Sequence, residues 1–188
     1  MEKLLRLGYL KREIPFGENP KKSKRSLYKV ADPFLDFYFT HIVPNRSFIE
    51  VEQSDAAWKR IEKAFPGYVE RHWERLCHRA VSKMTIEGKT FGPALRWWGG
   101  GSQPEFDVVA ESHDRECVLV GECKWTENQK DAGIIMREKI NKATGMNFIA
   151  GKRIIPILFI KKCPNKKHAD ILCYSPDDVF IPLRDFTK

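Results

Sequence analysis

Glu105-Phe106-Asp107-Val108-Val109 and Gly121-Glu122-Cys123-Lys124-Trp125 stand on either side of a short polar segment. Apolar and polar residues alternate around both, and successive side chains of a β-strand point to opposite faces. The polar segment between them has the length of a hairpin connection. We therefore predict two antiparallel strands that bring Asp107, Glu122 and Lys124 together on one face of a sheet.

The two carboxylates predict a metal site, because they repel each other unless a cation lies between them. Asp107 and Glu122 are the expected ligands, and their oxygen atoms suit Mg²⁺ or Mn²⁺. The backbone carbonyl of Cys123 is a further candidate ligand. Lys124 would lie beside an oxyanion held by the metal, and Glu105 is a spare acid on the strand face of Asp107. In a plainer interpretation, glutamate and lysine side chains simply pair across the strands at a solvated edge.

A helix that precedes these strands carries two more acids. Apolar residues recur at helical spacing between residues 68 and 84, which predicts one buried helix face. Glu70 falls within the apolar stripe and Glu74 at its border, so a site beside the sheet is within reach of either acid. A solvated or salt-bridged acid is the plainer interpretation of each. Pro66-Gly67 is expected to separate this helix from a shorter one at residues 54–65.

The remaining segments complete an α/β pattern. We predict a strand at 90–98, a helix at 127–146, a strand at 153–160 that is buried on both faces, and short strands at 171–174 and 179–181. Four apolar residues of the second helix are expected to face the core: Ile134, Ile135, Met136 and Ile140. From residue 68 the order is helix, three strands, helix, strand, which predicts an α/β fold with a mixed sheet.

An aspartate strand followed by Glu-X-Lys on the next strand, Asp107 and Glu122-Cys123-Lys124 here, resembles the PD-(D/E)XK nuclease superfamily. The predicted αβββαβ order matches the core of its restriction-endonuclease-like fold. One departure is that Pro104 stands three residues before Asp107 instead of directly before it. The resemblance implies a Mg²⁺- or Mn²⁺-dependent nuclease, with Asp107, Glu122, Lys124 and a helix acid at its catalytic site.

The first 66 residues are expected to lie outside this core, as an arm at residues 1–31 and bridging helices at residues 32–66. A helix end before Gly8 and two strands joined by a basic loop resemble the last helix and wing of a winged helix-turn-helix. A simple hairpin tether is the alternative. Asp32-Pro33 predicts the start of an aromatic helix that ends near Val43 and bridges the arm to the main domain. The expected units are residues 1–31, 32–66 and 67–188, the last being the nuclease-like domain.

A closer resemblance covers nearly the whole chain. The segment from Tyr28 to Ser47, with Trp73-Glu74, Arg96-Trp97-Trp98 and the two strand motifs, is similar to the C-terminal region of predicted archaeal-type AAA+ ATPases. That region is a domain of unknown function with a nuclease-like fold. The resemblance favours Glu74 over Glu70 as the helix acid and implies an ATPase module as a partner, in cis or in trans. The chain has no Gly-x-x-x-x-Gly-Lys-[Ser/Thr] motif, so ATP binding by that route is not expected.

Positive charge gathers in two parts of the chain, whose formal net charge is +8. Residues 1–48 hold 10 Lys and Arg against 5 Asp and Glu, and residues 126–167 hold 10 against 3. This distribution predicts contact with DNA through its backbone, whereas a solvated basic face is the plainer interpretation. Four basic residues of the second segment are candidates for phosphate contacts: Lys130, Arg137, Lys139 and Lys142.

The cellular setting is predicted from what the sequence lacks. Its 5 cysteines have no framework spacing, which favours reduced thiols. No apolar run approaches the ~18 residues of a membrane helix, and the N-terminus has no signal-peptide core. We therefore expect a cytoplasmic protein without a membrane partner.

Two alternatives to a nuclease stay open. The first keeps the fold without the chemistry, as a non-catalytic DNA-binding or regulatory module of an ATPase. The second is a general α/β interaction domain whose glutamate–lysine pairs are structural, and it predicts no metal affinity.

Overall fold

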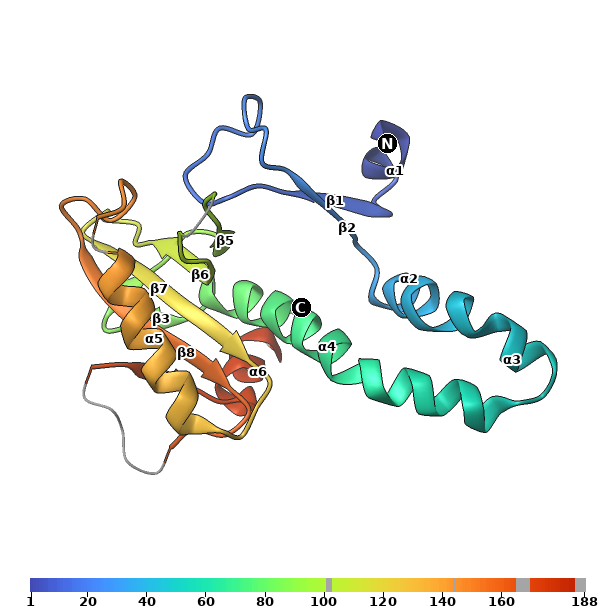
Figure 1. Ribbon diagram of the computed structural model, residues 1–188. Helices are drawn as coiled ribbons and strands as arrows, with labels where there is room; N and C mark the ends of the chain where they lie inside the picture. Colours follow the sequence, from blue (N-terminus) through green and yellow to red (C-terminus); the bar gives the residue numbers. More distant parts are fainter. Residues whose placement is uncertain (101–102, 144, 165–169, 185–188) are drawn as a thin grey trace.

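The computed structural model describes residues 1–100, 103–143, 145–164 and 170–184, without the side chains of residues 129–132. Its centre is a five-stranded mixed sheet in the order β5-β6-β7-β8-β9 (Figure 1). Antiparallel neighbours are β5 (Leu95–Trp97), β6 (Phe106–Glu111) and β7 (Cys117–Lys124). Parallel neighbours follow, with β8 (Arg153–Ile160) beside β7 and β9 (Leu172–Tyr174) beside β8. The predicted α/β fold with a mixed sheet is confirmed.

The predicted hairpin is formed by β6 and β7. Val108 pairs with Gly121 and Val109 with Val120, so Asp107 and Glu122 follow at the open end of the hairpin. A Cβ atom on Gly121 would clash with the Ile157 side chain and lie 2.5 Å from the Ile157 carbonyl oxygen. Glycine therefore lets β8 approach β7 directly before Glu122.

Helices cover both faces of the sheet (Figure 1). On one face lie α4 (Ser54–Val81) and α6 (Pro176–Arg184), which contact each other. On the other face lies α5 (Gln129–Ala143), against β7 and β8. From α4 onward the elements follow the predicted order of helix, three strands, helix and strand, namely α4, β5, β6, β7, α5 and β8. Two short strands, which were not predicted, follow α4 directly.

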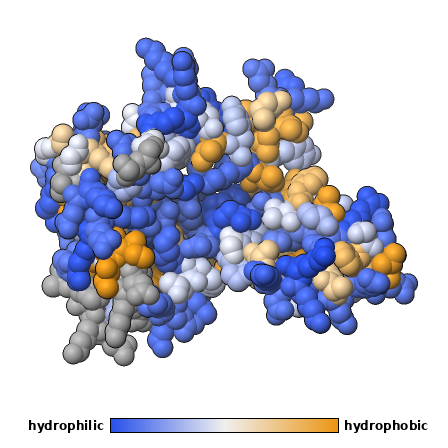
Figure 2. All heavy atoms as spheres, viewed as in Figure 1, coloured by the Kyte–Doolittle hydropathy of each residue, from blue (hydrophilic) through white to orange (hydrophobic). Residues whose placement is uncertain are grey.

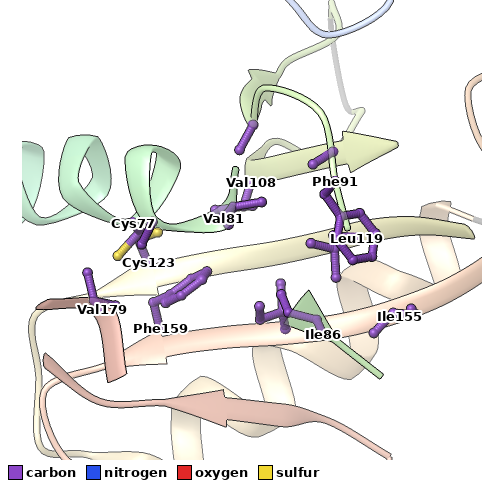
Figure 3. Close-up of a cluster of buried hydrophobic side chains, with 14 of the residues drawn as sticks. Cys77, Val81, Ile86, Phe91, Val108, Leu119, Cys123, Ile155, Phe159 and Val179 are labelled. Carbon is purple, nitrogen blue, oxygen red and sulfur yellow. The ribbon is translucent and has the colours of Figure 1, made fainter. Parts of the chain in front are cut away.

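Apolar side chains fill the space between α4, α6 and the sheet. Cys77 of α4 lies beside Cys123 of β7, and Val179 of α6 lies near Phe159 of β8 (Figure 3). The predicted stripe on the helix is confirmed, because four of its residues are buried: Trp73, Cys77, Ala80 and Val81. The five cysteines form no disulfide in the described residues.

The opposite face of the sheet packs on α5 through Met136 and Ala143, both fully buried. Ile140 is partly buried against this cluster. Ile134 and Ile135 are 54% and 42% exposed, so the prediction that they face inward is wrong. Residues 134, 135 and 136 are consecutive and therefore spread over more than one helix face, and only one face can lie against the strands.

Three predicted boundaries are wrong. α4 runs without a break through Pro66. The proline removes one backbone N–H donor, but the residues before and after it remain helical. The strand expected at 90–98 is broken at Gly92-Pro93 into β4 (Lys89–Thr90), which pairs with β3 (Thr85–Ile86), and β5. Residues 179–181 belong to α6 instead of a strand.

The start of α6 explains that last error. Asp178 accepts hydrogen bonds from the backbone N–H and the hydroxyl of Ser175, both at 2.7 Å. Pro176 occupies the first helical position, where a missing N–H costs no hydrogen bond. Ser-Pro-Asp-Asp is thus a helix start, and the apolar residues after it form a helix face.

The N-terminal arm begins with α1 (Glu2–Arg6) and the antiparallel pair β1 (Leu10–Glu13) and β2 (Leu27–Val30). Its strands reach the core at the edge strand β5, where the Phe16 N–H donates to the Arg96 carbonyl oxygen at 2.8 Å. The predicted hairpin is therefore present and is docked on the sheet edge. Within the described ranges, no helix is both long enough and apolar enough to cross a membrane.

A helical segment links this hairpin to α4. It comprises α2 (Pro33–Phe37), a π-helical turn (Tyr38–Ile42), a 3₁₀ turn (Val43–Asn45) and α3 (Arg46–Glu50). Asp32 caps it as predicted, accepting from the Leu35 N–H at 2.9 Å. The π-helical turn ends at Ile42 with Val43 as its C-cap, which agrees with the predicted end near Val43. The 3₁₀ turn that follows carries Pro44 in its first turn, where a missing N–H costs no hydrogen bond. Figure 2 shows apolar side chains exposed on the arm, and they include Leu4, Leu7, Phe34 and Phe39.

Candidate active site

The candidate site lies where β6 begins and β7 ends, and it brings together Asp107, Glu122 and Lys124. The Lys124 Nζ atom lies 3.3 Å from Asp107 Oδ2 and 3.4 Å from Glu122 Oε2. These three side chains come from two strands whose pairing was predicted from alternation. The structure therefore brings the predicted strand residues together.

Glu122 is the most deeply buried acid of the site, with 1% of its side chain exposed. Lys139 of α5 donates to Glu122 Oε1 at 2.6 Å. Glu122 Oε2 has no hydrogen bond within the described part of the chain, although the Lys124 ammonium is near. Burial and the neighbouring Asp107 raise the pKa of Glu122, and the two lysines oppose that rise. One carboxylate oxygen thus has unused capacity to bind a cation.

Lys124 is held as an ammonium by its acidic neighbours. Burial alone would lower the pKa of Lys124, but Asp107, Glu122 and Glu70 outweigh burial and raise it above its ordinary value. The Nζ atom also lies 3.8 Å from Glu70 Oε1. Lys124 is therefore a fixed positive charge among three acids at neutral pH.

Asp107 is oriented by two backbone contacts that sequence reasoning missed. Its Oδ2 atom accepts from the Cys123 N–H at 3.0 Å, and its carbonyl oxygen accepts from His78 Nε2 at 2.6 Å. Burial lowers the pKa of His78, so its neutral ring acts as the donor. His78 lies one helical turn after Glu74 on α4, and this spacing was the available signal.

The two helix acids occupy different surroundings. Glu70 faces Lys124, whereas Glu74 Oε1 lies 3.3 Å from Arg96 Nε and 4.0 Å from His78 Nε2. Burial and the nearby Asp107 raise the pKa of Glu74 to about 7, against the opposing charge of Arg96. The acid in contact with Lys124 is thus Glu70, and Glu74 lies on the Asp107 side of the site.

Arg96 of β5 belongs to the Arg96-Trp97-Trp98 motif, but its contacts at the site were not predicted. Beyond Glu74, its guanidinium lies 3.7 Å from Glu13 of β1 and 3.7 Å from Glu105. Glu105 is 61% exposed, so the spare acid lies at the rim of the site. Arg96 thereby connects the N-terminal hairpin, the helix acid and the strand that carries Asp107.

The carboxylates of the site are the candidate ligands of a divalent metal ion. Within the described ranges, no three histidine, cysteine, aspartate or glutamate side chains are grouped closely enough to hold a metal ion. Asp107 and Glu122 still both approach the Lys124 ammonium, at 3.3 and 3.4 Å. Mg²⁺ is commonly held by one or two carboxylates and keeps several waters, and Glu122 Oε2 is a buried oxygen without a hydrogen bond. Two carboxylates therefore fit a hydrated Mg²⁺ or Mn²⁺ ion.

Two of the four basic residues predicted to contact phosphates pair with acids in the structure. Lys139 pairs with Glu122. Arg137 pairs with Asp170 at 2.9 Å. Lys142 is exposed on α5, and the side chain of Lys130 lies outside the described residues. Within the described ranges, Lys142 forms no ion pair with an acid.

Comparison with known proteins gives a family. Residues 38–135, which are 98 of the 188 residues, match the DUF234 family, described as "Archaea bacterial proteins of unknown function". The chain belongs to this family. It is also 26% identical over 182 residues to the "Uncharacterized protein MJECL04" of Methanocaldococcus jannaschii. That match covers 95% of this chain and 40% of the relative, so the chain spans about two fifths of the relative's length. No solved structure matches.

Proposed function

We propose that this chain is a metal-dependent deoxyribonuclease domain that hydrolyses DNA phosphodiesters. The observation that carries the proposal is the convergence of Asp107 and Glu122 on the Lys124 ammonium, at 3.3 and 3.4 Å. Paired carboxylates beside a fixed cation are suited to binding a metal and stabilising the charge of a phosphate in transition. A domain that only packs against partners has no need to place two acids side by side at a sheet end.

The order of elements supports a restriction-endonuclease-like core. α4, β5, β6, β7, α5 and β8 follow the αβββαβ order, with β7 and β8 parallel. The site lies at the end of β7, where the Glu-X-Lys motif of the PD-(D/E)XK superfamily would place it. The N-terminal hairpin agrees with the wing of a winged helix, and this assignment is part of the proposal.

Asp107 and Glu122 would hold Mg²⁺ or Mn²⁺, with the Cys123 carbonyl as a further ligand and Glu74 completing the site directly or through water. The metal supplies polarisation of the phosphate and a water of lowered pKa. With Asp107 and Glu122 binding the metal, Lys124 would donate hydrogen bonds to a phosphoryl oxygen or to the attacking water. His78 and the Cys123 N–H keep Asp107 in place throughout.

The relative from Methanocaldococcus jannaschii is much longer than the matched region. With the similarity to the C-terminal region of AAA+ ATPases, this supports a partnership with an ATPase module, in cis or in trans. The basic character of residues 1–48 supports contact between the arm and a DNA backbone.

The test is a nuclease assay with Mg²⁺ and with Mn²⁺ on single-stranded, duplex, flap and junction DNA. Wild type is compared with Asp107→Ala and Lys124→Ala, after circular dichroism has confirmed that both variants fold. The proposal expects metal-dependent cutting that both substitutions abolish. Binding without cutting, unchanged by either substitution, would instead favour the non-catalytic DNA-binding or regulatory module of an ATPase.

A further inference from the structure

A cavity of about 350 Å³ lies between α4, Trp125 and α6. One wall is α4, through Tyr68, Val69 and Trp73, and the facing wall is formed by Trp125, after β7, and Phe180 of α6. The Trp73 and Trp125 rings are in contact, with centroids 5.3 Å apart. The cavity is at the small end of the usual range of ligand sites, about 300–1,000 Å³.

The walls offer ring faces more than hydrogen bonds. The Tyr68 hydroxyl donates to the Pro33 carbonyl oxygen at 3.0 Å, and His72 Nε2 lies 3.0 Å from Asp36 Oδ2. The Arg75 guanidinium donates to the Ala31 carbonyl oxygen. Because these polar groups already bind residues 31–36, a ligand in the cavity would meet mainly aromatic and aliphatic surface. Such a surface suits a flat ring that stacks.

The cavity adjoins the residues of the candidate site. Trp125 directly follows Lys124, and Val69 directly precedes Glu70. Neighbouring Cα atoms are about 3.8 Å apart, and the Lys124 and Glu70 side chains approach to 3.8 Å. Each of the two walls thus contains a residue that is the direct sequence neighbour of a residue of the candidate site.

The cavity wall also carries positive charge. Arg79 contributes to the cavity wall and is exposed on α4, one turn after Arg75. Its guanidinium pairs with no acid within residues 1–100, 103–143, 145–164 and 170–184. An arginine in this position complements a phosphate whose base enters the cavity.

We propose that this cavity binds one unpaired nucleobase of the DNA strand, next to the phosphodiester held at Asp107, Glu122 and Lys124. The inference rests on the proposed function and specifies its substrate class. A base in a duplex has its faces stacked and its edge paired, so entry requires single-stranded DNA or a nucleotide flipped from the helix. Single-stranded, frayed or flap DNA is therefore the preferred substrate over continuous duplex.

The first test measures binding without cutting. The full chain with Asp107→Asn is titrated into a labelled single-stranded oligonucleotide and into its duplex, by fluorescence anisotropy in Ca²⁺. Val69→Phe fills the cavity and Trp125→Ala removes one wall, whereas Trp58→Ala changes a tryptophan that is 54% exposed on the outer part of α4. Loss of one stacked base weakens binding by about 5- to 150-fold.

We expect a loss of roughly tenfold for single strands with Val69→Phe and Trp125→Ala, little change for duplex, and no change with Trp58→Ala. A second measurement leaves the protein unaltered and replaces each base of the oligonucleotide in turn by an abasic residue. One position should then account for most of the loss. Equal losses on single strand and duplex, or no position-dependent loss, would overturn the inference.

The results separate this inference from the proposed nuclease. If wild type cuts no DNA but the cavity variants still weaken single-strand binding, the base site stands and the nuclease fails. If wild type cuts DNA and the cavity variants leave its preference between single strand and duplex unchanged, the nuclease stands and the base site is overturned. Cavity variants that bind DNA normally but lose a protein partner would assign the cavity to that partner and also overturn the inference.

Discussion

The Lys139 Nζ atom lies 2.6 Å from Oε1 of Glu122, a carboxylate with 1% of its side chain exposed. Lys139 belongs to α5, on the opposite side of the sheet from α4. The buried acid is thus held by one lysine from the helix and approached by another, Lys124, from its own strand. This contact fixes Glu122 in place before any ligand binds.

Lys139→Met should destabilise the metal-free protein by about 3 kcal/mol, because it leaves a buried carboxylate without its closest cation. Urea denaturation in EDTA measures the loss. Lys142→Met, an exposed lysine of the same helix, is the matched control and should change stability by less than about 0.5 kcal/mol. The double variant Glu122→Gln/Lys139→Met should lose less than the two single variants summed, because the two side chains interact. Full additivity would contradict the pairing.

Divalent metal should stabilise the folded chain through Asp107 and Glu122. Mn²⁺ at about 100 times its dissociation constant should add about 2.7 kcal/mol to the free energy of unfolding. Thermal unfolding with and without Mn²⁺, at constant ionic strength, measures this. Asp107→Asn should remove most of the increase, and Glu105→Gln, an exposed acid of the same strand end, should keep it. An equal response of wild type and Asp107→Asn would place the metal elsewhere.

The raised pKa of Glu74 predicts a pH dependence of stability. The folded pKa is about 7 and the ordinary value is 4.5, so the folded state binds more protons between these values. Stability contributed by Glu74 is therefore full below about pH 4.5 and is lost as pH rises to about 7. Relative to wild type, Glu74→Gln should gain about 3 kcal/mol across this window, because one pKa unit corresponds to 1.36 kcal/mol.

Urea denaturation in EDTA at several pH values gives this difference. Glu62→Gln, on the exposed outer part of α4, controls for removing a glutamate from the same helix. If the stability difference between Glu74→Gln and wild type stayed constant from pH 4.5 to 7, Glu74 would not be the buried, proton-binding acid described above.

Gly121 sets the spacing of β7 and β8 next to Glu122. Gly121→Ala should cost about 1–3 kcal/mol, since the added methyl group meets Ile157 in a packed core. Gly100→Ala, at a position with open space around it, is the control and should be nearly neutral. Chemical denaturation compares the two. Equal stability of both variants would show that the strands can separate without cost.

The elements predicted most accurately are those in which apolar residues recur at the regular spacing of a strand or a helix. Alternation predicted the β6–β7 hairpin, and helical spacing predicted the buried face of α4 that holds Trp73 and Cys77. Asp107, Glu122 and Lys124 were placed together because one hairpin register fixes all three. These features depend on residues close in the sequence.

The errors come from features that depend on tertiary packing or on local capping. Lys139 and Glu122 stand 17 positions apart, and only the seating of α5 on β7 and β8 brings them together. Arg96 joins Glu13 and Glu74 through the docking of the N-terminal hairpin. Pro66 was expected to end a helix whose packing keeps it continuous.

The central claim is metal-dependent hydrolysis of DNA at Asp107, and one rate tests it most directly. It is the initial rate at which the purified full chain cuts an end-labelled single-stranded oligonucleotide in Mn²⁺, beside Asp107→Asn at the same concentration and an EDTA control. The account predicts cutting by wild type that falls at least about 100-fold in the variant and in EDTA. A wild-type rate equal to that of Asp107→Asn, for a variant that folds normally, would contradict it.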